Sequence, residues 1–231
     1  MAKLKNLWFD FVDLVFPRCC AACNGSLLGN EETICTVCRM VLPRIEKNGV
    51  YAEDIQYRFA GIPEVLSTQS FLLFTKRGKA QKLLHALKYR GNKDVGLLLG
   101  FMFGKELIQE AQLPVAELIV SVPLHKRKLA KRGYNQSDLL AEGLSQATGI
   151  PWSATALTRN KFTETQTGKS KQERRDNVAG VFGVEPGLRC DSVIVIDDVL
   201  TTGATLSACV ETLREAGFKE FHILTIAVAQ H

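Results

Sequence analysis

The stretch VIVIDDVLTTGAT, residues Val193–Thr205, decides the fold of this 231-residue chain. Its four β-branched residues indicate a strand that is buried on both faces of a parallel sheet. Two carboxylates follow, then a loop of small residues and the start of a helix. Such a loop offers backbone N–H groups and the positive end of a helix dipole, which together bind phosphate. Because two carboxylates repel a phosphate, we expect Asp197 and Asp198 to bind sugar hydroxyls or a phosphate-bound Mg²⁺.

Strand and helix patterns alternate on either side of this stretch. Short β-rich runs predict strands at Ser70–Thr75, Glu117–Val122, Ser192–Ile196 and Phe221–Ala229. Apolar residues at helical spacing predict helices over Lys79–Leu87, Asp94–Ala111, Ser137–Thr148 (capped by Ser137) and Thr205–Ala216. This alternation predicts an α/β fold in which a mostly parallel sheet carries helices on both faces. Ligands of such sheets bind at the carboxyl ends of the strands.

Four of the seven cysteines form two closely spaced pairs, Cys20-x-x-Cys23 and Cys35-x-x-Cys38. A two-residue gap turns both sulfurs of a pair to one side, so two pairs can surround Zn²⁺ tetrahedrally. Cys19 in place of Cys20 gives a three-residue gap and is the alternative register. Four thiolates leave no open position for water, which predicts a structural zinc in a small zinc-ribbon-like module.

The chain divides into three parts: an amphipathic helix over 1–16, a Cys₄ module over 17–50 and an α/β domain over 51–231. The helix is expected to dock on its own domain, and a contact with a membrane protein is the alternative. The longest uncharged apolar run, Val95–Gly104, is far shorter than the ~20 residues of a membrane span. No secretory signal is recognisable at the N-terminus. We therefore expect a cytoplasmic protein without a membrane span, peripheral at the inner membrane only through a partner.

The net charge of +5 is unevenly distributed. Lysine and arginine gather in the windows Lys76–Lys93, Ser121–Asn135 and Arg159–Arg175. Such segregation indicates clefts for a polyanion, either a phosphorylated small molecule or nucleic acid. Solvated surface lysines are the alternative for any single window.

The stretch 193–205 resembles the phosphoribosyl-pyrophosphate (PRPP) signature of type I phosphoribosyltransferases. It lacks the Gly-Lys-Ser/Thr of a Walker loop and the G-x-G-x-x-G of a dinucleotide fold. The whole chain resembles the ComF family, the competence-associated phosphoribosyltransferase-like proteins tied to DNA uptake in natural transformation. The resemblance rests on the Cys₄ pairs and, in order, on Lys88-Tyr89-Arg90-Gly91, Val122-Pro123-Leu124-His125, Arg132-Gly133-Tyr134-Asn135-Gln136, Gln166-Thr167, Arg174 and Asn177.

The resemblance implies a role for each part of the site. Asp197 and Asp198 bind the ribose 2′- and 3′-hydroxyls. The 5′-phosphate is bound by the loop of Thr201, Thr202, Gly203, Ala204 and Thr205. The diphosphate meets the turn of Pro123, Leu124 and His125, where the resemblance implies a strained backbone with a cis peptide bond. A flexible loop over Thr163–Asn177 closes over the site, although Lys169 replaces the apolar residue of the family pattern.

Three arginines are candidates for contacts to the diphosphate, because a guanidinium grips phosphate oxygens in bidentate fashion. They are Arg127, Arg132 and Arg174, and for each of them a surface salt bridge is the alternative. With Asp197 and Asp198, Arg174 completes the set of catalytic candidates. The sequence identifies no nucleophile and no general base.

The function that we expect is that of a Mg-dependent, PRPP-binding protein of the competence type, which also binds single-stranded DNA and contacts the DNA-uptake machinery. Tyr89, Tyr134 and Phe162 are expected to stack on bases. One alternative is a non-catalytic DNA-handling protein whose PRPP site is regulatory. Another is a base-salvage phosphoribosyltransferase, which the Cys₄ module disfavours. Thr201 also stands where enzymes of the hypoxanthine-guanine type carry an aspartate.

Overall fold

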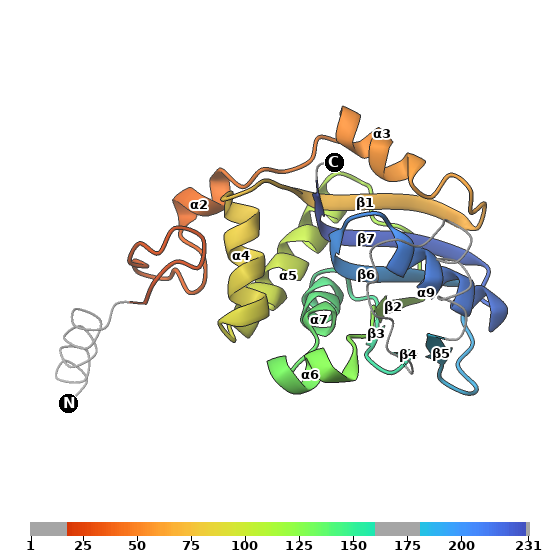
Figure 1. Ribbon diagram of the computed structural model, residues 1–231. Coiled ribbons are helices and arrows are strands. Elements are labelled where there is room, and N and C mark those ends of the chain that lie inside the picture. Colours follow the sequence, from red (N-terminus) through yellow and green to blue (C-terminus); the bar gives the residue numbers. More distant parts are fainter. Residues whose placement is uncertain (1–17, 160–180, 230–231) are drawn as a thin grey trace, which may run out of the picture.

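A five-stranded sheet, parallel throughout, forms the centre of the molecule (Figure 1). The computed structural model describes residues 18–159 and 181–229. The expected helix over 1–16, Phe162, Arg174 and the expected closing loop over Thr163–Asn177 therefore lie outside the described residues. The strand order is β1 (Val65–Phe74), β7 (Glu220–Ala229), β6 (Ser192–Leu200), β2 (Leu118–Ser121) and β3 (Trp152–Ser153). A separate antiparallel pair joins β4 (Leu157–Arg159) and β5 (Phe182–Val184).

Alternating residues of the central strands feed two hydrophobic cores, one on each face of the sheet. Ile194 and Ile196 of β6 pack on the face covered by α4 (Lys79–Tyr89), α5 (Lys93–Gln109) and α7 (Gln136–Thr148). Val193 and Val195 point to the other face, toward α9 (Ala204–Glu215) and the apolar side of α3 (Val50–Tyr57). The unbroken β-branched run thus buries both faces of the strand, which confirms the predicted architecture.

The cysteine-rich N-terminal segment packs on the first of these cores. Cys20, Ala22 and Ile34 share a buried cluster with Leu83 of α4 and Leu99 of α5. The segment ends in the short helix α2 (Thr36–Met40). Beyond it the chain runs along the outer edge of β1 before α3 begins. The 17–50 and 51–231 parts therefore share one core, and the boundary between them stays a prediction.

The connections reverse direction between β2 and β6. From β2 the chain passes through α6 (Lys126–Arg132) and α7 to β3, away from the centre of the sheet. From β6 it passes through α9 to β7, toward the opposite edge. A parallel sheet is open to ligands at such a reversal, at the carboxyl ends of the two strands. The carboxyl-terminal part of the stretch Val193–Thr205 lies at this reversal.

Two element boundaries differ from the predicted ones in ways that matter for the site. β6 continues to Leu200 instead of ending at Ile196, because Asp197 pairs in register with Thr225 of β7. The cap of α7 is Asn135 and not Ser137, since the Asn135 side chain accepts a hydrogen bond from the Ser137 N–H at 3.3 Å. The Ser137 side chain is thereby left for another partner.

Candidate functional site

Asp197 and Asp198 lie near the carboxyl end of β6, and a different helix holds each carboxylate. The Ser137 hydroxyl, in the first turn of α7, donates to Asp197 at 2.9 Å. The Lys88 ammonium, in the last turn of α4, donates to Asp198 at 2.8 Å. The Asp198 N–H also donates to the Asp197 carboxylate at 2.8 Å. Two helices that flank the sheet therefore fix the orientation of the pair.

The environment of Asp197 disfavours its ionised form. Burial, together with the negative charge of Asp198, raises its pKa from 3.8 to about 7. The donors from Ser137 and the Asp198 backbone only partly offset these effects. A cation or hydroxyl donors brought by a ligand would favour the charged carboxylate. The pair is therefore suited to a ligand that carries hydroxyls or a divalent metal.

The small-residue loop after β6 leads directly into α9. Gly203 caps this helix with a φ of 83°, a backbone conformation that residues other than glycine rarely adopt. A Cβ at Gly203 would also stand 3.1 Å from the ring of Phe59, so a larger residue there would have to displace that ring. Thr201, Thr202, Ala204 and Thr205 are exposed. An exposed loop at the start of a twelve-residue helix has the geometry of a phosphate site.

Residues at the end of α3 hold this loop from behind. The Arg58 guanidinium donates to the carbonyl oxygen of Thr201, and it also pairs with Asp54 one turn earlier. Phe59 supplies the ring beside Gly203. With the Thr201 carbonyl engaged by a cation, less negative potential faces a phosphate bound at this loop.

The turn after β2 starts beside the aspartate pair. The Val122 N–H donates to the carbonyl oxygen of Ile196 at 3.0 Å, so Pro123, Leu124 and His125 follow at the same edge of the sheet. The expected cis peptide bond is wrong for this turn, because the described residues contain none. His125 instead caps α6, accepting from the Arg127 N–H at 3.1 Å, and all-trans backbone carries the chain from the strand into the helix.

A buried polar network fixes where this turn leaves the sheet. Asn135 donates to the carbonyl oxygen of Val122 at 3.1 Å and to Asp138 at 2.7 Å. Ser121 donates to the same carboxylate at 2.6 Å. Burial raises the pKa of Asp138. The network joins the start of α7 to the end of β2, and so orients Ser137 toward Asp197.

The basic candidates of the second window lie on α6, which has no buried residue. Arg132 donates to the Gln136 side chain at 2.6 Å, and its guanidinium lies 5.3 Å from the centre of the Tyr89 ring. Arg127 is exposed in the first turn of the same helix. Both arginines follow the turn that begins beside Asp197. A diphosphate contact by either one stays a prediction.

Three residues that hold the site have roles the sequence did not reveal. Lys88 stands in the sequence Lys88-Tyr89-Arg90-Gly91 and in a basic window, and neither indicates its partner Asp198. The position of Ser137 before an apolar run predicts a helix cap and not a contact with Asp197. Nothing in the sequence around Arg58 indicates its contact with Thr201, because the two residues lie 143 positions apart. For Lys88, the one available hint is that its window, Lys76–Lys93, contains no acidic residue with which it could pair.

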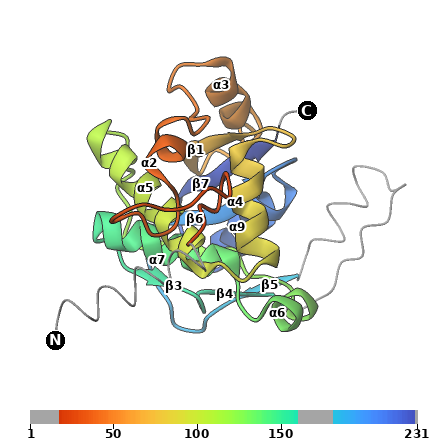
Figure 2. The same cartoon turned by 90° about the vertical axis from the view of Figure 1, so that its left-hand side faces the viewer.

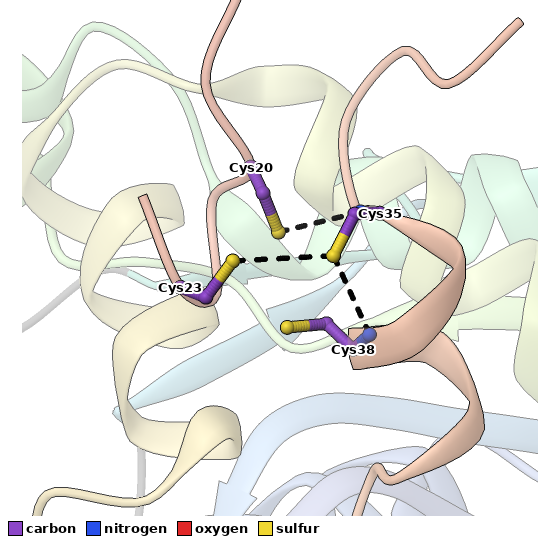
Figure 3. Close-up of side chains that lie close together, drawn as sticks. All are labelled: Cys20, Cys23, Cys35 and Cys38. Carbon is purple, nitrogen blue, oxygen red and sulfur yellow. Dashed lines mark hydrogen bonds between the residues drawn. The ribbon is translucent and has the colours of Figure 1, made fainter. Parts of the chain in front are cut away.

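The four paired cysteines converge at the base of α2 (Figure 3). Their sulfurs all lie within 4.8 Å of one another, and those of Cys23 and Cys35 are 3.9 Å apart. A tetrahedral zinc with Zn–S bonds of about 2.3 Å requires sulfurs about 3.8 Å apart, so the donor set fits this metal. Cys20, and not Cys19, belongs to the cluster.

Backbone groups already favour a thiolate at one corner of this cluster. Burial by itself raises the pKa of Cys20, but backbone N–H groups, led by that of Cys35 at 3.3 Å, lower it to about 7. Cys35 caps α2 by accepting from the Cys38 N–H at 3.4 Å. The fold therefore gathers four thiols at one point that can hold a metal such as zinc.

None of the helices in the described ranges is long and apolar enough to cross a membrane.

Comparison with known proteins finds relatives over most of the chain. The family model "Phosphoribosyl transferase domain" matches residues 97–231. Competence protein F of Haemophilus influenzae is 37% identical over 222 residues, which are 91% of this chain and 96% of that protein. DNA utilization protein YhgH of Salmonella typhi is 33% identical over 138 residues, 58% of this chain and 61% of that protein. The match thus spans less than two thirds of this relative's length.

Two solved structures give weaker matches. Glutamine PRPP amidotransferase from B. subtilis is 26% identical with a TM-score of 0.42, over 61% of this chain and 30% of that one. Orotate phosphoribosyltransferase from Aeropyrum pernix is 17% identical with a TM-score of 0.36, over 78% of this chain and 81% of that one.

Proposed function

This chain belongs to the competence protein F family of phosphoribosyltransferase-like proteins, and from that premise we propose that it binds PRPP with Mg²⁺ at the end of β6. We place its role in the cytoplasm, in the handling of DNA taken up during natural transformation. The observation that carries the proposal is the position of Asp197 and Asp198 directly before the Gly203 cap of α9, in the crevice between β2 and β6.

The chemistry of each part fits one part of PRPP. The carboxylates of Asp197 and Asp198 accept hydrogen bonds from the ribose hydroxyls. The N–H groups of the exposed loop Thr201–Thr205 bind the 5′-phosphate at the positive end of α9. The diphosphate would then point toward the turn Pro123–His125 and α6, and a bound Mg²⁺ would shield its charge. Pro123–His125 contributes backbone groups, and Arg127 and Arg132 contribute positive charge.

The reaction that such a site supports is displacement at the anomeric carbon of the ribose. The bond from this carbon to the pyrophosphate oxygen breaks, and the oxygen keeps the electron pair. A lone pair of the acceptor forms the new bond to the carbon. Negative charge accumulates on the leaving pyrophosphate, and the cations of α6 would stabilise it; a bound Mg²⁺ would supply further positive charge there. Pyrophosphate release in the presence of an acceptor distinguishes an enzyme from a regulatory protein that binds PRPP without turnover.

Calorimetry with PRPP and Mg²⁺ tests the site. Asp197→Asn and Asp198→Asn should each weaken binding roughly ten- to a hundredfold, because each removes a charged hydrogen-bond acceptor worth about 1.5–3 kcal/mol. Ribose 5-phosphate should compete, since it carries the same phosphate and hydroxyls. Asp191→Asn is the matched control, because this exposed residue lies just before the other end of β6 and pairs with Lys219.

Two outcomes would remove the proposed site. The parent protein fails to bind PRPP, or the doubly substituted protein binds it as tightly as Asp191→Asn does. Circular dichroism and metal content, measured on every variant, separate a lost contact from a lost fold.

We propose that the cysteine cluster holds one structural zinc. Four thiolates complete a tetrahedral sphere, so this metal supplies stability and no open position for chemistry. The cluster contributes buried residues to the core that also contains α4. Because α4 carries Lys88, the metal would support the element that positions Asp198.

A second activity, binding of single-stranded DNA, is favoured by an exposed basic and aromatic surface beside this site. Tyr89 is 64% exposed, and its ring lies 4.9 Å from that of His85 and beneath the guanidinium of Arg132. Five of the seven residues of α6 are lysine or arginine. A stacking platform next to basic side chains is what strands of any sequence bind. The Tyr134 hydroxyl, by contrast, donates to the Leu87 carbonyl and is used in packing.

Titration of labelled single-stranded DNA against salt tests this activity. The slope of log affinity against log salt should be about −0.7 for each phosphate contacted. Arg127→Glu with Lys128→Glu should flatten that slope. Lys47→Glu with Lys105→Glu changes the net charge equally, away from α6, and should leave the slope unchanged.

The stacking contribution is tested separately. Tyr89→Ala should weaken DNA binding roughly five- to a hundredfold, because base stacking on an aromatic ring is worth ~1–3 kcal/mol. Tyr57→Ala on α3 is the control, since Tyr57 is 81% exposed on another part of the molecule. Affinity that does not change with salt, or equal losses in both tyrosine variants, would refute the DNA-binding surface.

A further inference from the structure

The outer edge of β1 is covered over only half of its length. The segment Pro43–Ile45 runs antiparallel beside the second half, where the Ile45 N–H donates to the Phe71 carbonyl at 3.1 Å and the Leu73 N–H donates to the Pro43 carbonyl at 2.7 Å. Backbone groups alternate in direction along a strand, so those of Ser67 and Gln69 point to this same edge. Among the residues that the structure describes, the covering segment pairs with Phe71 and Leu73 and extends no further.

A groove lies along the uncovered half. A cavity of about 500 Å³ opens between β1, α3 and the C-terminal part of α5, with Ile55 and Leu107 in its lining. A second hollow of about 420 Å³, lined in part by Phe59 and Ile62, continues along the strand. Both cavities include Ser67 and Thr68. The buried Thr68 hydroxyl has no hydrogen-bond partner among the described residues.

The larger cavity is acidic, although the chain as a whole carries a charge of +5. Its lining includes Glu46, Glu53, Glu106 and Glu110 against the single cation Lys47. Arg44, just outside the lining, pairs with Glu106 at 2.7 Å, so the groove keeps a surplus of two negative charges. α3 lines this groove, and Figures 1 and 2 place this helix at the opposite end of the molecule from the basic helix α6. This charge repels nucleic acid. A second copy that paired through its own β1 edge would bring the same acidic rim against itself.

We propose that this groove is a docking site for an extended, lysine- or arginine-rich segment of a partner protein, which adds a strand to β1 at Ser67 and Gln69. Strand addition supplies main-chain hydrogen bonds, while pockets beside the edge select alternate side chains. Here one set of alternate side chains of the partner segment would pack against the apolar lining, and the other set, lysine or arginine, would pair with the glutamates. The groove contains none of the residues Thr201–Thr205, although both places contact the end of α3, so the proposal does not require that PRPP binds.

Fluorescence anisotropy with a labelled eight-residue peptide of alternating lysine and valine tests the proposal. Glu53→Lys with Glu110→Lys should weaken binding at least tenfold, whereas Glu185→Lys with Glu215→Lys, an equal charge change elsewhere, should not. Two further peptides carry N-methyl groups at alternate residues, one on the lysines and the other on the valines. One of the two should bind at least tenfold more weakly than the unmethylated peptide, because its methyl groups block the main-chain N–H groups that face β1. The amide protons of Ser67 and Gln69 should become protected from exchange when the unmethylated peptide binds.

Three results would overturn the proposal. The lysine peptide does not bind saturably, both methylated peptides bind as tightly as the parent, or the two charge-reversed proteins behave alike. Protection confined to residues outside β1 would also refute strand addition. The protein with Asp197→Asn and Asp198→Asn should still bind the peptide, so failure of the PRPP site and failure of this one are distinguishable.

Discussion

At the scale of single residues, the buried carboxyl of Asp197 makes the stability of the folded protein depend on pH. Its pKa in the folded protein is about 7, whereas an unfolded chain holds an aspartate near 3.8. Between about pH 4 and 7 the folded state therefore keeps a proton that the unfolded state has released. Unfolding in this window releases that proton, so this residue lowers the free energy of unfolding as pH rises. Well above pH 7 both states are deprotonated, so this residue lowers the free energy of unfolding no further.

Replacing this carboxyl should stabilise the protein at high pH. We expect Asp197→Asn to raise the melting temperature by at least about 3 °C at pH 8, where one kcal/mol corresponds to about 2–4 °C in a chain of this size. The gain should shrink as pH falls toward 4. Scanning calorimetry of parent and variant across this range, without ligand, measures the difference.

Asp191→Asn again serves as the control, because its carboxylate is exposed and pairs with Lys219. A gain at pH 8 that persists unchanged at pH 4.5 would show that the substitution acts through packing and not through the proton.

At the scale of elements, α5 and α7 touch backbone to backbone. A Cβ at Gly100 would stand 2.2 Å from the Leu140 carbonyl oxygen, and one at Gly143 would stand 2.1 Å from that of Leu97. Both obstacles are main-chain atoms, so no side chain can turn aside to make room. The glycines therefore set the distance between the two helices. Through α7, they also fix the position of Ser137.

Gly100→Ala should consequently destabilise the protein. Overpacking costs about 1–3 kcal/mol, whereas alanine in place of glycine gains only about 0.5–1 kcal/mol in a helix. Urea unfolding should show a net loss. Gly61→Ala is the control, because nothing lies within 4 Å of its added carbon. Equal stability of the two variants would contradict the tight packing of these helices.

The sequence predicted those elements whose signal is local. The β-branched run before Asp197 specified a buried strand, and the cysteine spacing specified the cluster, since both patterns act over a few neighbouring positions. It could not predict that Lys88 meets Asp198 or that Arg58 meets Thr201, because these contacts join positions 110 and 143 residues apart. Nor could it predict the end of β6, which depends on pairing with β7.

At the scale of the whole molecule, the cysteine cluster and the α/β layers share one core. Removing a bound zinc should therefore lower the stability of the molecule beyond residues 17–50. We expect one zinc per chain in protein purified without added metal. Chelation or Cys38→Ser should bring this to near zero and lower the melting temperature, because a bound structural metal contributes its binding energy to folding.

Cys19→Ser is the matched control, since Cys19 is adjacent in sequence and lies outside the cluster. It should keep its zinc and its stability. Equal zinc loss in both variants would assign Cys19 to the coordination sphere, and full stability after chelation would show that the metal is not structural.

The contact between Arg58 and Thr201 has a thermodynamic consequence. One helix, α3, lines the acidic groove along β1, and Arg58 at its end holds the loop Thr201–Thr205, for which we propose phosphate binding. Linkage is reciprocal: a ligand whose affinity depends on the position of α3 changes phosphate affinity by the same factor by which phosphate changes its own. A peptide titration with and without ribose 5-phosphate measures this coupling constant directly, and Arg58→Ala is the substitution that would bring it to one.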